Sequence, residues 1–81
     1  MTMKVLSFFK ITHGNADNVV NALREIEGVV KVSYITGVYD IVAEIEVDEP
    51  ETLHDIFARH VDKITGITET LSHLVMKTWK K

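Results

Sequence analysis

The 81-residue chain contains no cysteine, and it has only one proline and four glycines. Without cysteine it can form neither disulfides nor thiolate metal sites. A chain of this length buries only about 60–65% of its unfolded surface, so a domain of this size often needs support from a partner. Apolar residues nevertheless make up 46% of the sequence, which is ample for a packed core and argues against intrinsic disorder.

Basic charge is also scarce, because nine Lys and Arg residues face twelve Asp and Glu residues and the net charge is −3. Nucleic-acid affinity depends on clustered Lys and Arg, and such a cluster occurs only at the C-terminus, with Lys77, Lys80 and Lys81. We therefore predict no direct DNA binding. No apolar run approaches the ~20 residues of a membrane-spanning helix, and the N-terminus lacks the pattern of a secretory signal. We expect a cytoplasmic protein with no membrane contact.

Apolar periodicity and chain breakers predict the element order β-α-β-β-α-β in one domain, residues 1–81. The expected strands are Met3 to Thr12, Val29 to Ile35, Tyr39 to Val47 and Ile67 to Trp79. Apolar residues at three- and four-residue steps indicate two amphipathic helices, which end at Gly28 and Gly66. Asn15 or Asp17 is expected to cap the first helix, and Pro50 to lie in the first turn of the second. This order predicts an α+β fold, a ferredoxin-like βαββαβ sandwich with a four-stranded antiparallel sheet and two helices on one face.

The first and last strands are expected to be apolar on both faces. In the first strand, Val5 and Phe9 on one side alternate with Leu6 and Phe8 on the other. Two helices cover only one face of a sheet, and a monomer rarely exposes a large apolar face. We therefore expect a homodimer that buries the second face sheet against sheet.

The connection between the second and third strands, Ile35 to Asp40, is the most distinctive segment. Gly37 is its only residue with free access to positive φ, so the chain is expected to reverse there. A turn needed only for reversal requires neither the ring of Tyr39 nor the carboxylate of Asp40. A small-molecule site would use both, with the carboxylate facing an ammonium group and the glycine backbone allowing close approach. The alternative is a plain strand connector with Tyr39 packed at the sheet edge.

A second candidate segment runs from Gly66 to Ser72. In a strand, Thr68, Thr70 and Ser72 share one face. Their hydroxyls could offer donors and acceptors to a carboxylate or an amide. Hydroxyl side chains also suit β-structure and cross-strand hydrogen bonds, so a purely structural role stays open.

The sequence contains no convincing catalytic or metal constellation. His54 and His60 are six residues apart on an expected helix and point about 240° apart, while His13 and His73 are isolated. The serines lack an elbow motif or a neighbouring base, and single glycines form no phosphate loop. We expect no enzyme activity, no metal and no cofactor.

Taken together, these segments resemble the ligand-binding domain of the Lrp/AsnC (feast/famine) regulators, also called the RAM domain. The resemblance runs from about Val5 to Lys77 and includes Gly14 after the first strand. Its two motifs are Thr36-Gly37-Val38-Tyr39-Asp40 and Ile64-Thr65-Gly66-Ile67-Thr68-Glu69-Thr70-Leu71-Ser72. Ile67 and Ser72 depart mildly from the family pattern, which has Val and Thr at these places.

The resemblance implies a non-enzymatic, amino-acid-binding regulatory module that dimerises through its sheet. It also implies that dimers assemble into higher oligomers or rings and bind a free amino acid where they meet. The implied ligand-binding residues are Thr36, Gly37, Tyr39, Asp40, Gly66, Thr68, Thr70 and Ser72. The family's N-terminal helix-turn-helix has no counterpart here, so the chain resembles a stand-alone module whose partners include full-length Lrp/AsnC transcriptional regulators.

Two other functions share this fold class. An ACT-like regulatory domain also senses amino acids, but it normally uses the first strand–helix loop. A small dimeric ferredoxin-like enzyme, such as a monooxygenase-like αβ barrel, would want a His, Asn or Trp cluster between sheet and helices. Trp79, near the C-terminal end, is poorly placed for that.

Overall fold

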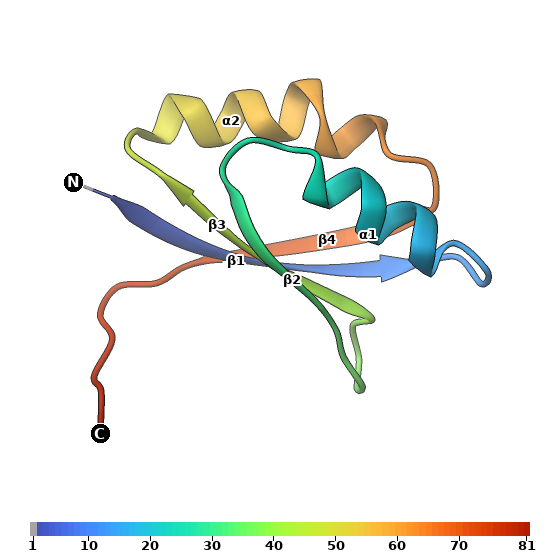
Figure 1. The fold of residues 1–81 in the computed structure, drawn as a ribbon, viewed down its shortest axis with the longest axis horizontal. Coiled ribbons are helices and arrows are strands. Elements are labelled where there is room, and N and C mark those ends of the chain that lie inside the picture. The colour runs from blue at the N-terminus through green and yellow to red at the C-terminus, as the bar shows by residue number, and fades with distance from the viewer. Residues whose placement is uncertain (1) are drawn as a thin grey trace.

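Four antiparallel strands form one sheet in the order β2-β3-β1-β4, and two helices lie on one of its faces (Figure 1). The structure is a computed structural model that describes residues 2–81. Its elements are β1 (Met3–Ile11), α1 (Ala16–Arg24), β2 (Val29–Tyr34), β3 (Ile41–Val47), α2 (Pro50–Arg59), the short 3-10 helix η1 (Val61–Lys63) and β4 (Ile67–Leu74). The predicted ferredoxin-like α+β fold is confirmed. No helix in residues 2–81 is long and apolar enough to cross a membrane.

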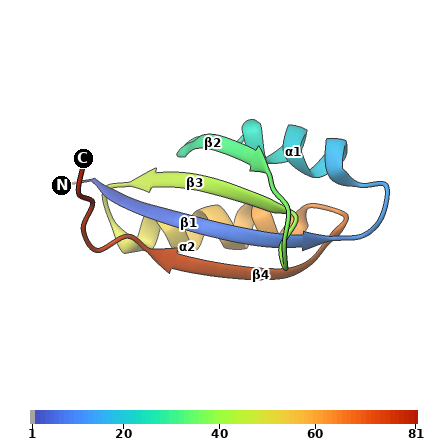
Figure 2. The same cartoon turned by 90° about the horizontal axis from the view of Figure 1, so that it is seen from below.

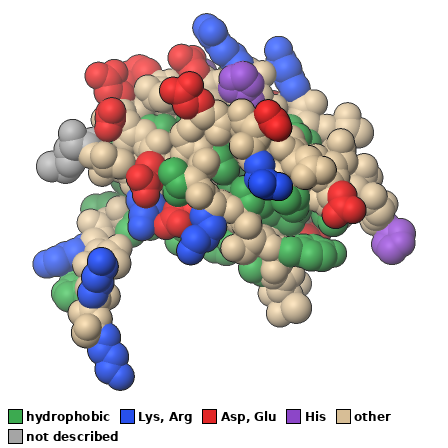
Figure 3. Space-filling view, in the orientation of Figure 1, with side chains coloured by type: hydrophobic (Ala, Val, Ile, Leu, Met, Phe, Trp, Pro, Cys, Tyr) green, Lys and Arg blue, Asp and Glu red, His purple; other side chains and the backbone are tan. Residues whose placement is uncertain are grey.

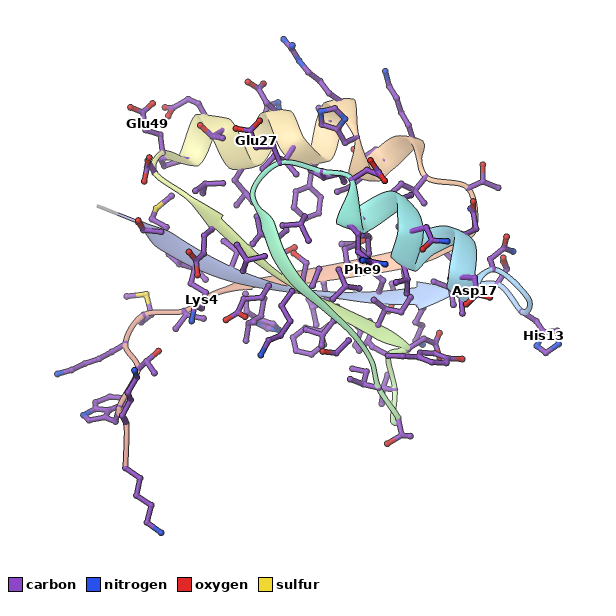
Figure 4. The ribbon with its side chains drawn as sticks, viewed as in Figure 1. Lys4, Phe9, His13, Asp17, Glu27 and Glu49 are labelled. Atoms are coloured by element: carbon purple, nitrogen blue, oxygen red, sulfur yellow. The ribbon has the colours of Figure 1, made fainter. Side chains whose placement is uncertain are left out.

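The core fills the space between the sheet and the two helices. Strand alternation supplies its sheet side, because every second residue of β3 is buried while Val42, Glu44 and Glu46 face the other way. Figure 4 shows Phe9 pointing from β1 toward the helices, and this side chain is fully buried. The buried apolar residues are Val5, Phe9, Val19, Leu23, Ile26, Ile41, Ala43, Ile45, Val47, Ile56 and Val61. Burial of one such large side chain stabilises the fold by about 1.5–3 kcal/mol.

The predicted ends of both helices are wrong, although their apolar stripes are right. α1 ends at Arg24 and not at Gly28, and a turn follows in which the Ile26 N–H donates to the Leu23 carbonyl at 3.1 Å. α2 ends at Arg59 because His60 leaves helical geometry, with φ −126° and ψ −61°. The chain then tightens into η1, which keeps Val61 in the core at 2% exposure.

The last strand is shorter than predicted, since β4 ends at Leu74 and not at Trp79. Its partner β1 begins at Met3, and the final bond between them joins the Val75 N–H to the Lys4 carbonyl at 2.9 Å. Residues 75–81 are not part of a strand. They form a C-terminal tail, residues 75–81, which leaves the sheet on the side opposite the helices (Figure 1).

The face of the sheet opposite the helices carries no covering layer in residues 2–81, and we call it the bare face. Strand register places Leu6 beside His73 and Phe8 between Val42 and Leu71. In Figure 2, which looks at the molecule from this side, the sheet lies in front of α2. Lys4 and Glu44 form an ion pair on this face, with 2.9 Å between Nζ and Oε1. A hollow of about 390 Å³ lies over Leu6, Phe8 and Val42.

Candidate functional site

Residues 35–40 join β2 to β3 as a hairpin turn, in agreement with the sequence prediction. The turn closes where the Ile35 N–H donates to the Asp40 carbonyl at 2.8 Å. Gly37 has a φ of +117°, the left-handed region that glycine enters without strain. Thr36 and Gly37 are exposed, and a Cβ added to Gly37 would meet nothing within 4 Å. The backbone of the turn is therefore open to an approaching group.

Asp40 fastens the base of the hairpin turn to β1. Its N–H donates to the Phe9 carbonyl at 2.9 Å, and its carboxylate Oδ2 accepts the Ile11 N–H at 3.0 Å. β3 begins only at Ile41, which pairs with Phe9, so the Ile11 N–H lies beyond the start of β3 and has no partner in that strand. The Asp40 side chain supplies the missing acceptor. The structure gives no hydrogen bond from residues 2–81 to its other oxygen, Oδ1.

Tyr39 lies at the centre of a second group of contacts, which we call the Tyr39 cluster: Phe8, Lys10, Tyr39 and Glu69. The rings of Tyr39 and Phe8 are 5.9 Å apart between centroids, and the Lys10 Nζ lies 5.8 Å from the Tyr39 centroid. A hydrogen bond to the Glu69 carboxylate raises the pKa of the Tyr39 hydroxyl above its ordinary value. The hydroxyl thus stays protonated at neutral pH. It can therefore donate a hydrogen bond.

Thr70 and Ser72 of β4 lie on the opposite side of the sheet from the Tyr39 cluster. Thr70 pairs with Phe9 and Ser72 with Ser7, which places both on the helix side of the sheet. The Ser72 hydroxyl is 2.8 Å from the hydroxyl of Ser7, which is fully buried. Ser72 thus satisfies a core hydroxyl.

Thr68 lies in the register shift between β1 and β4, where its hydroxyl donates to the Lys10 carbonyl at 3.3 Å. With Thr70 it lines a hollow of about 180 Å³ beside η1.

Gly66 packs closely against Thr12 and Asn15 of the same chain. Its carbonyl accepts the Thr12 N–H at 2.8 Å. A Cβ added to Gly66 would lie 2.7 Å from the Asn15 Cβ. This glycine therefore allows the loop before β4 to pack on the start of α1, and its surroundings leave less space for a ligand than those of Gly37.

The structure brings the two sequence motifs together through Glu69. That residue and Lys10 are register partners on the side of the sheet where Tyr39 packs. Sequence reasoning missed both of them as site residues. The available signal was opposite charge on two strands, but it becomes informative only once the register of β1 against β4 is known.

A shallow hollow of about 230 Å³ lies on another side of Asp40. It is lined by Ile11, Thr12, His13, Gly14, Ala16, Tyr34 and Asp40. Figure 4 shows His13 at the tip of the first strand–helix loop, pointing away from the rest of the chain. Residues 2–81 hold no group of three or more His, Asp or Glu side chains that could bind a metal ion. The chemistry on offer is recognition of charge by Asp40, Lys10 and Glu69, beside the wall formed by Tyr39.

Comparison with known families shows that the profile of the Lrp/AsnC ligand binding domain aligns with residues 4–81. No curated protein sequence matches the chain.

Solved structures share the fold at low sequence identity. TTHA0845 from Thermus thermophilus has a TM-score of 0.89 at 20% identity, covering 98% of this chain and 99% of its own. The hypothetical protein PHS023 from Pyrococcus horikoshii has a TM-score of 0.86 at 18% identity, covering 96% of this chain and 93% of its own. The transcriptional regulator NMB0573 from Neisseria meningitidis, a complex with L-Met, has a TM-score of 0.88 at 14% identity. That match covers 98% of this chain and 53% of the regulator.

Proposed function

The chain belongs to the Lrp/AsnC ligand-binding domain family, and from this premise we propose that it binds a free amino acid at the hairpin turn and assembles through its bare face. Family membership makes it a regulatory ligand-binding module. The neighbouring regulator in complex with L-Met supports an amino acid as the ligand class. Binding to full-length Lrp/AsnC regulators would pass the ligand signal to proteins that control transcription.

The observation that carries this proposal is the open backbone at Gly37 between residues that are held in place. Nothing lies within 4 Å of a Cβ position on Gly37. Asp40 is fixed by three hydrogen bonds at the base of the turn, and Tyr39 is fixed by ring contacts to β1. A turn held in this way needs little reorganisation on binding, which favours affinity.

The charges suit a zwitterion. The Oδ1 atom of Asp40 and the Glu69 carboxylate are acceptors for an α-ammonium group, while Lys10 is a donor for an α-carboxylate. The ring of Tyr39 borders the ligand side chain, and Thr36 adds a hydroxyl. Thr68, Thr70, Ser72 and Gly66 would contribute from another dimer, since in their own chain they lie on the helix side or pack internally.

The bare face supports self-assembly. Its apolar residues Leu6, Phe8, Val42 and Leu71 are half-buried or exposed in one protomer. Two such faces stacked about 10 Å apart would bury them as the core of a β-sandwich. The proposed unit is a homodimer, and contacts between dimers at the hairpin turns build the higher assemblies.

Calorimetry with each of the twenty amino acids tests ligand binding, and Asp40→Asn separates the two roles of that residue. The amide oxygen can still accept the Ile11 N–H, but the charge is gone. Hydrogen bonds to charged groups are worth about 1.5–3 kcal/mol, so we expect binding to weaken roughly 10- to 100-fold with unchanged unfolding in urea. Asp40→Ala loses the bond to Ile11 as well, and we expect a further loss of stability of about 1–3 kcal/mol.

Two glycine variants locate the ligand. Gly37→Ala places a methyl group on the open turn, and Gly14→Ala places one at a second positive-φ glycine with equally open surroundings. We expect Gly37→Ala to weaken binding more. A larger effect of Gly14→Ala would place the ligand in the first strand–helix loop, as in ACT-like domains. Wild-type affinity in both Asp40→Asn and Gly37→Ala, or binding of none of the amino acids by the wild type, would refute the proposal.

A further inference from the structure

The C-terminal tail contains large apolar side chains that residues 2–81 leave almost uncovered. Met76 is 87% exposed and Trp79 is 76% exposed. The contact of the Trp79 ring within the chain is with Lys77, whose Nζ lies 5.1 Å from the ring centroid. Trp and Met are among the residues most enriched at protein interfaces, so these two exposed side chains are candidates for burial against a partner.

The direction of the tail fits a second copy of the chain. The tail leaves β4 after the bond between Val75 and Lys4 and extends on the side of the bare face, the side on which the hairpin turn also projects (Figure 1). A facing sheet would lie about 10 Å away. Seven extended residues span roughly 23 Å, which is enough to cross that distance and continue along the second copy.

The charge of the tail also favours a second copy of the chain as its binding partner. The three lysines of the tail have no acidic neighbour within it, so the net charge of −3 divides into +3 for residues 75–81 and −6 for residues 1–74. Figure 3 shows the blue lysine side chains of the tail apart from the red acidic groups that gather over the rest of the molecule. On the bare face Lys4 and Lys31 offset Glu44 and Glu46, so the excess of negative charge lies on the rest of the body. A basic segment therefore finds a complementary surface on another copy.

From these three observations we propose that the C-terminal tail of one copy packs on the body of the second copy in the dimer, with Trp79 as its apolar anchor and Lys80 and Lys81 as its charged contacts. The two-fold symmetry of a homodimer makes the exchange reciprocal. This inference rests on the proposed dimer, but it makes a separate claim about which residues complete the interface.

Trp79 is the only tryptophan in the chain, so its fluorescence reports on the tail alone. We expect a blue-shifted emission and protection from acrylamide in the dimer, with sedimentation velocity measured on the same samples. The dissociating variant Leu71→Glu is expected to shift the emission to the red and to restore quenching. Trp79→Ala is expected to raise the dimer dissociation constant roughly 10- to 30-fold. The paired variant Lys80→Ala with Lys81→Ala is expected to reduce the salt dependence of association.

Each outcome separates the two claims. A wild-type dimer in which Trp79 is quenched as readily as free tryptophan overturns this inference and leaves the dimer standing. A monomer at every concentration overturns both the dimer and the tail contact. Protection of Trp79 that persists in monomeric Leu71→Glu shows that the tail folds onto its own chain, and this also overturns the inference.

Discussion

Gly66 and Gly37 have similar backbone conformations but different surroundings. Their φ angles are +107° and +117°, so a side chain at either position is strained. Only Gly66 is also crowded, because its Cβ position lies 2.7 Å from the Asn15 Cβ. The first glycine therefore serves packing, and the second is available for binding.

This difference predicts a stability order for glycine-to-alanine variants. Gly66→Ala combines backbone strain with overpacking, each worth about 1–3 kcal/mol. Gly14→Ala is the matched control, since its φ of +88° gives strain without a neighbour within 4 Å. We expect urea unfolding to show the larger loss for Gly66→Ala. Equal losses would mean that Asn15 moves aside at no cost.

The Lys4–Glu44 pair predicts a pH dependence with a defined sign. Their mutual hydrogen bond, followed by their mutual charge, lowers the pKa of Glu44 below its ordinary value of 4.5 and raises the pKa of Lys4 above 10.5. The Glu44 contribution is present above pH 4.5 and is lost as the pH falls through the lowered pKa. The Lys4 contribution is present below pH 10.5 and is lost as the pH rises through the raised pKa.

Glu44→Gln tests this dependence. We expect the variant to melt below the wild type at pH 7 and the difference to vanish in acid, once Glu44 is protonated. Thermal melting at one protein concentration measures it, because assembly also affects the melting point. In one protomer the two side chains are 40% and 20% exposed, so the effect expected from the pair alone is small. A difference that persists below the pKa of Glu44 would assign the loss to packing and not to charge.

At the scale of elements, local pattern was enough to predict which segments are helices and strands. Apolar alternation in β3 and the helical stripe of α1 are properties of neighbouring residues, and both appear as expected. The ends of elements depend on partners that lie far away in sequence. β4 stops at Leu74 and its last backbone bond to β1 joins Val75 to Lys4, although the apolar residues continue to Met76.

The candidate site also has some features that follow from local sequence and others that depend on strand pairing. The turn at Gly37 and the positions of Tyr39 and Asp40 beside it follow from local sequence. The Tyr39–Glu69 contact and the bond from the Ile11 N–H to Asp40 depend on how β1 pairs with β3 and β4. The shift in the register of β1 against β4, between Lys10 and Ile11, has no local signal in the sequence.

Register also provides a matched pair of variants on β4. Leu71 pairs with Phe8 on the bare face, while Leu74 pairs with Val5 on the helix side. Their exposures are similar, at 41% and 52%. We expect Leu71→Glu to dissociate the dimer, because it buries a charge in the interface, and Leu74→Glu to leave the mass unchanged. Sedimentation velocity decides between them, and dissociation by Leu74→Glu alone would place the interface on the other side.

At the scale of the whole molecule, charge limits what partners the chain attracts. The acidic residues are spread over most elements, whereas the only dense basic segment is the C-terminal tail. A ligand-sensing role is compatible with this distribution, because a small zwitterion is recognised by a few placed groups and not by a long-range field. A nucleic-acid surface needs the opposite arrangement.

We therefore expect no sequence-specific DNA binding by this 81-residue chain, and at most a weak contact through the tail that salt removes. The tail can neutralise at most three phosphates through Lys77, Lys80 and Lys81. With a slope of about −0.9 per contact, affinity would fall roughly 40-fold between 50 and 200 mM salt. Fluorescence anisotropy with two duplexes of unrelated sequence measures this, and a chain truncated after Val75 is the control in which residual binding disappears. A preference for one duplex that survives 200 mM salt and the truncation would contradict the prediction, because it would require a base-reading surface that residues 1–74, with a net charge of −6, do not supply.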